Sequence, residues 1–75
     1  MQNYEQRITS HPDILLGKLV ISGTRISVET ILRKLSEGMT TTDILTAYPT
    51  LTPDDIFAVL SYSADVIATE NLIAS

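Results

Sequence analysis

The sequence has no cysteine and a single histidine, His11, among its 75 residues. Without cysteine the chain forms neither a disulfide nor a thiolate metal site, and we expect an ordinary cytoplasmic protein. One histidine also argues against a zinc site. No apolar run reaches the roughly 20 residues of a membrane helix, and the first ten residues lack the basic start and apolar run of a signal peptide. We therefore expect no cofactor, no metal ion and no membrane contact.

Cations are scarce and unevenly distributed. All five lie in the first 34 residues beside three acidic residues, whereas the rest of the chain has six acidic residues and no cation. The net charge is −4, with a basic beginning and an acidic remainder. Because DNA binding depends on neutralising phosphate, this charge does not favour a nucleic-acid partner.

Apolar residues are plentiful for so short a chain. They make up 44% of the sequence, and the mean hydropathy is +0.19. A single domain of this size removes only about 60–65% of its unfolded surface from water, so its own core is small. We therefore expect a second copy to cover part of the apolar surface, as a homodimer.

Three short motifs carry the pattern of a helix start. In each, a hydroxyl residue follows an apolar residue and precedes an isoleucine by four positions, with the caps at Ser27, Thr40 and Thr52. Asp43 and Asp55 stand three residues after the second and third caps, as in a capping box. The sequence therefore predicts three helices, of which the last two form a helix–turn–helix outline.

The lengths of these helices follow from their periodicity and breakers. The first should end at Gly38, the second before Pro49, and the third should run from Pro53 to about Glu70. The third helix is apolar over a wide arc, which indicates contacts on two sides. Its candidate protein interface consists of Phe57, Leu60, Ala64 and Ile67.

Residues before Ser27 lack helical periodicity. Short extended segments over residues 7–10 and 18–21, with a break at Ser22-Gly23, predict a small β-hairpin-like element. We expect a loose tail over residues 1–6, a single domain over residues 7–70 and a frayed tail over residues 71–75. The predicted fold class is mainly α, a three-helix bundle preceded by this β element.

No group of residues indicates catalysis. Asp54 and Asp55 are the only adjacent carboxylates, and their position in a first helical turn is explained by capping and by the helix dipole. His11 lies beside Pro12 and fits a turn better than a catalytic role. We expect a protein that is not an enzyme.

DNA binding is the alternative that the helix–turn–helix outline raises, since such a pair often inserts its second helix in the major groove. That helix begins with Asp54 and Asp55, which phosphate would repel. The candidate DNA-binding residues are instead the cations of the β element and first helix, namely Lys18, Arg25, Arg33 and Lys34.

Two long runs, GKLVISGTRISVETIL and EGMTTTDILTAYPTLTPDDIFAVLSYSADVI, resemble the bacterial domain-of-unknown-function family 433 over roughly residues 8–67. The most specific parts of this match are Gly17-Lys18, Val20-Ile21, Gly23-Thr24-Arg25-Ile26, Glu37-Gly38-Met39, Tyr48-Pro49, Leu51-Thr52 and Asp55-Ile56. The sequence departs from the usual pattern at Leu19, Ser22 and Ser27, where family members often carry Pro, Arg and Pro.

The resemblance implies a homeodomain-like three-helix fold after a small β element. It also implies the role of an antitoxin-like protein whose partner is a small PIN-like nuclease. Our leading hypothesis is a dimeric, non-catalytic interaction module of this type, and the competing one is a sequence-specific DNA-binding transcriptional regulator.

Overall fold

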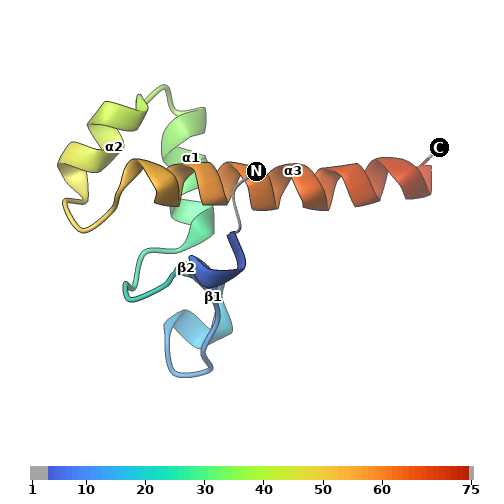
Figure 1. Ribbon diagram of the computed structural model, residues 1–75, viewed down its shortest axis with the longest axis horizontal. Helices are drawn as coiled ribbons and strands as arrows, with labels where there is room; N and C mark the ends of the chain where they lie inside the picture. Colours follow the sequence, from blue (N-terminus) through green and yellow to red (C-terminus); the bar gives the residue numbers. More distant parts are fainter. Residues whose placement is uncertain (1–3, 75) are drawn as a thin grey trace.

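The computed structural model describes the backbone of residues 4–74 and the side chains of residues 4–69. The elements in chain order are η1 (Tyr4–Gln6), β1 (Ile8–Thr9), η2 (Leu15–Gly17), β2 (Val20–Ile21), α1 (Val28–Ser36), α2 (Thr41–Ala47) and α3 (Pro53–Ala74). The predicted class, three helices preceded by a small antiparallel β element, is confirmed. The long helix α3 crosses the molecule, and its C-terminal half extends beyond the other elements (Figure 1).

The β element is a two-stranded antiparallel sheet in which Ile8 faces Ile21 and Thr9 faces Val20. The segment between the strands contains η2, where Leu15 and Leu16 have φ angles of 49° and 57°. Such left-handed angles are uncommon for leucine, and the side chain of Leu16 is 98% exposed. The loop between the strands is therefore an irregular, exposed part of the fold.

All three predicted helix starts are confirmed. The Ser27 hydroxyl accepts a hydrogen bond from the Thr30 amide, while Thr40 and Asp43 exchange hydrogen bonds as a complete capping box. Thr52 and Asp55 make the same exchange at the start of α3. Local chemistry thus sets where each helix begins.

The helix ends follow the predicted breakers in two cases. Gly38, with a φ of +96°, comes two residues after α1, and α2 stops at Ala47, two residues before Pro49. The third helix instead continues to Ala74, past the expected end near Glu70. Residues 71–74 contain neither glycine nor proline to stop it, and Ser75, the last residue of the expected frayed tail, lies outside the described residues.

The core is made where α1, α2, α3 and the β element meet. It consists of the buried residues Ile8, Ile21, Val28, Ile31, Ile44, Leu51, Ile56, Ala58 and Val59. Each helix-start motif contributes its isoleucine to this core, so the caps also orient the core side chains. Within the described part of the chain, no helix is long and apolar enough to cross a membrane.

The expected loose tail differs from the structure over residues 4–6. These form η1, which lies against α3. The Tyr4 ring contacts the ring of Tyr62 edge-on, with centroids 5.6 Å apart, and its hydroxyl donates to Asp65 at 2.7 Å. Aromatic and hydrogen-bond contacts to a distant helix order this segment, and residues 1–3 of the expected tail fall outside the described residues.

Candidate functional site

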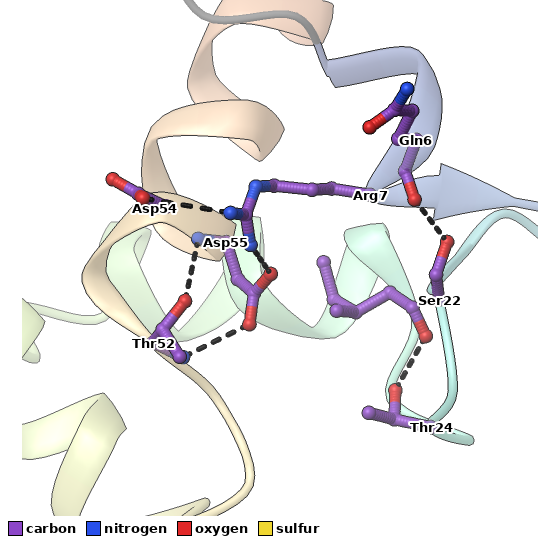
Figure 2. A network of polar contacts seen from close by, with 8 residues as sticks. Gln6, Arg7, Ser22, Thr24, Thr52, Asp54 and Asp55 are labelled. Carbon is purple, nitrogen blue, oxygen red and sulfur yellow. Dashed lines mark hydrogen bonds and ion pairs between the residues drawn. The ribbon is translucent and has the colours of Figure 1, made fainter.

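The first turn of α3 is held by a network of charged and polar groups (Figure 2). Arg7, just before β1, reaches Asp55 with an N–O distance of 3.0 Å and Asp54 with one of 3.5 Å. Asp55 also accepts a hydrogen bond from the Thr52 amide at 2.9 Å, and its side chain is only 10% exposed. This carboxylate therefore joins the N-terminal segment to the start of α3.

The network explains the adjacent carboxylates without catalysis. Both oxygens of Asp55 are occupied, one by Arg7 and the other by the helix cap. Asp54 is half exposed and makes only the longer contact with Arg7. Among the described residues, no three His, Cys, Asp or Glu side chains are grouped so that they could hold a metal ion.

Arg7 is the residue of this network that the sequence did not reveal. It stood among five cations with no local feature to distinguish it, and its partners are 47 and 48 positions away in the chain. The two adjacent carboxylates at a capped helix start were the available signal. These carboxylates predict a helix cap and a favourable interaction with the helix dipole, but they do not predict an ion pair with a distant arginine.

Two of the four candidate DNA-binding cations share one carboxylate. Lys18 and Arg33 each lie 3.0 Å from an oxygen of Glu29. The hydrogen bond from Lys18, followed by that from Arg33, holds the pKa of Glu29 below its ordinary value. The charge of Lys18 and Arg33 is therefore partly neutralised at the surface.

Arg25 and Lys34 make no ion pair with any other side chain that the structure describes. Arg25 is exposed after the turn at Gly23, where it lines a shallow depression of about 430 Å³ with Thr9, His11, Ile14, Val20, Gly23 and Thr24. Lys34 is half-buried in the last turn of α1. The candidate basic surface is thus reduced to two unpaired cations.

The candidate protein interface forms one exposed apolar line along α3. Phe57, Leu60 and Ile67 are 50%, 45% and 57% exposed, and Ala64 is also exposed. Spacings of three, four and three residues place these four on the same side of a helix. We call them the α3 stripe; the adjoining Ile56 and Val59 are covered by the core.

The structure thus has a core built by three capped helices and an apolar line on α3 that the described residues leave uncovered. The family model described as "Protein of unknown function (DUF433)" matches residues 8–63. The chain belongs to this family. No curated protein matches it.

A solved structure shares the fold of this DUF433 chain. It is the crystal structure of a DUF433 member protein from Anabaena variabilis ATCC 29413, with a TM-score of 0.76 and 28% sequence identity. The similarity covers 95% of this chain and 71% of the other. The similarity therefore extends over nearly the whole chain and beyond the matched residues 8–63.

Two of the three departures from the usual family pattern have visible structural roles. Ser22 donates a hydrogen bond from its hydroxyl to the Gln6 carbonyl at 3.0 Å and from its amide to the Arg7 carbonyl at 2.8 Å. Ser27 caps α1 through its hydroxyl, which a proline lacks. These serines hold the N-terminal segment against the β element and begin the first helix.

Proposed function

We propose that this DUF433 protein is a non-catalytic, antitoxin-like interaction module that acts in the cytoplasm as a dimer and binds a PIN-like nuclease. The observation that carries the proposal is the α3 stripe, a line of large apolar side chains left open by the fold. Exposed apolar patches of this kind mark surfaces that contact other proteins.

The polar groups support the same conclusion. The carboxylates Glu29, Asp43 and Asp55 and the cation Arg7 are all engaged in caps or ion pairs that hold the fold. These groups are therefore occupied in maintaining the structure. The α3 stripe makes none of these polar contacts and is exposed apolar surface, which suits association more than chemistry.

Co-expression with the product of the neighbouring gene tests the antitoxin part of the proposal. If that product is a PIN-like nuclease, the two chains should co-purify in a fixed ratio, and nuclease activity should fall when this chain is added. A Thr46→Ala variant, altered at an exposed position of α2, serves as the matched control and should behave as the wild type. A nuclease that neither co-purifies with this chain nor loses activity when it is added would contradict the proposal.

Sequence-specific DNA binding is the second candidate, favoured by the α2–turn–α3 outline and by the unpaired cations Arg25 and Lys34. Under this alternative, Arg25→Ala should weaken operator binding and lower the dependence of log affinity on log salt by about one unit per lost phosphate contact. Thr46→Ala is again the control. Absence of operator-dependent binding at low salt would remove this candidate.

A further inference from the structure

We propose that two copies of the chain pair through the α3 stripe with their α3 helices antiparallel, so that Leu60 of each copy contacts Ala64 of the other. This inference rests on the proposed interaction role of α3. It adds that the partner is a second copy of the chain, that the two helices run antiparallel, and which residues face each other. Phe57 of each copy then contacts Ile67 of the second copy at the two ends of the contact.

The spacing of the stripe supports a helix as its partner. Residues 57, 60, 64 and 67 follow the alternation of three and four positions that forms the seam between two packed helices. The stripe lies on a helix of 22 residues, which corresponds to a length of about 33 Å. The seam on one copy is therefore matched in length and period by the identical seam on another.

The sizes of the side chains select the orientation. An antiparallel pair with its two-fold axis near residue 62 sets the large Leu60 against the small Ala64 in both central layers. A parallel pair in register would instead set leucine against leucine and alanine against alanine, which crowds one layer and leaves a gap in the next. Alternating large and small residues across a contact fill space better, so the antiparallel arrangement is favoured.

The distribution of charge favours the same orientation. The stripe itself contains no charged residue, so two copies with a net charge of −4 meet there without direct like-charge contacts. All the cations precede residue 35, and one of them, Arg7, lies at the first turn of α3. Antiparallel pairing sets the positive N-terminal end of each helix dipole toward the acidic C-terminal half of the other helix, whereas parallel pairing brings the two acidic halves together.

The extension of α3 beyond the body provides room for this arrangement. The C-terminal half of the helix projects past α1, α2 and the β element (Figure 1). Val66, on the opposite side from Ala64, is 44% exposed, so this half of the helix is open on both sides. The projecting half of one copy can therefore lie along residues 57–60 of the second copy without meeting another part of its own chain.

Cysteine cross-linking tests the orientation cleanly, because the chain has no cysteine of its own. Leu60→Cys protein carrying an affinity tag is mixed with untagged Ala64→Cys protein and oxidised. A disulfide needs Cα atoms about 4.4–6.8 Å apart, so antiparallel pairing predicts a tagged–untagged product several-fold more abundant than either self-linked product. Thr69→Cys, exposed on another side of the same helix, is the control and should remain largely unlinked.

The possible outcomes separate this inference from the proposed function. Preferential self-linking of Leu60→Cys would overturn the antiparallel register while leaving an α3 dimer in place. A monomeric wild type that still forms the nuclease complex would overturn the pairing but retain the antitoxin role. If the chain neither self-associates nor binds the nuclease, both proposals fail.

Discussion

The side of α3 that carries Ile56 and Val59 packs into the core with α1 and α2, whereas Phe57, Leu60 and Ile67 are open. Both sets are apolar, yet the described part of the chain covers only the first. On the inner side, the neighbouring polar groups are paired, as the Arg7–Asp55 contact shows. The comparison teaches that a small domain can carry more apolar surface on one helix than its own core covers.

Truncation on the inner side should have the largest effect. Ile56 is 1% exposed, and replacing it with alanine leaves a cavity that costs about 2–5 kcal/mol of unfolding free energy. Denaturant unfolding followed by circular dichroism measures the loss, which should be equally large at low and high protein concentration. A cost under about 1 kcal/mol would show that the inner side is not the core.

Leu60→Ala is the matched change on the outer side. Leu60 is 45% exposed within one chain, so its truncation should cost well under the Ile56 value when the protein is dilute. At high concentration the cost should grow, because dimer formation stabilises only the wild type. A loss of unfolding free energy that does not vary with protein concentration would argue that the outer side of α3, like the inner side, contacts only its own chain.

The Arg7 network offers a comparison of two adjacent carboxylates. Asp55→Ala removes a helix cap and a charged hydrogen bond from a nearly buried site, and should cost about 2–3 kcal/mol. Asp54→Ala removes a longer and more exposed contact, and should cost under about 1 kcal/mol. Thermal and denaturant unfolding of both variants checks the difference, and equal losses would mean that Arg7 does not distinguish the two positions.

Removing the charge of Glu29, which pairs with the exposed cations Lys18 and Arg33, should change the stability by a smaller amount that depends on pH. Lys18 and Arg33 lower the folded pKa of Glu29, so the ionised carboxylate stabilises the folded protein above the unfolded pKa of about 4.3. This stabilisation disappears as the pH falls through the folded pKa. The stability difference between wild type and Glu29→Gln should therefore shrink from pH 6 to pH 2. A difference that stays constant over this range would contradict the assigned ion pairs.

The smallest expected effect concerns η1. The hydrogen bond from Tyr4 to Asp65 raises the pKa of the Tyr4 phenol. This bond therefore stabilises the folded protein below the ordinary pKa of about 10, and the stabilisation is lost as the pH rises through the folded pKa. Ultraviolet titration should detect a phenol that ionises above the ordinary pH range, and Tyr4→Phe should remove that late step. An unchanged titration in the variant would show that Tyr4 does not make this contact.

Sequence predicted best what neighbouring residues determine. The caps at Ser27, Thr40 and Thr52 and the stop at Gly38 all depend on residues within a few positions of one another. The contacts of Arg7 with Asp55 and of Tyr4 with Asp65 link segments 48 and 61 positions apart, so local pattern did not reveal them. The end of α3 was also missed, because no breaker marks it.

The sequence also indicated that α3 has two apolar sides, and it assigned Phe57 and Leu60 to a protein interface. The structure leaves these two side chains exposed and covers their neighbours Ile56 and Val59, and the packing of α1 and α2 supplies the reason. Membership of the DUF433 family supports the fold and leaves the function to be tested.

The mass of the wild-type protein in solution, measured by light scattering over a range of micromolar concentrations, tests the open side of α3 most directly. The predicted result is twice the 8.2 kDa of one chain, returning to the single-chain mass when Leu60 and Ile67 are both replaced by serine. A wild-type mass of one chain at every concentration would contradict the dimer.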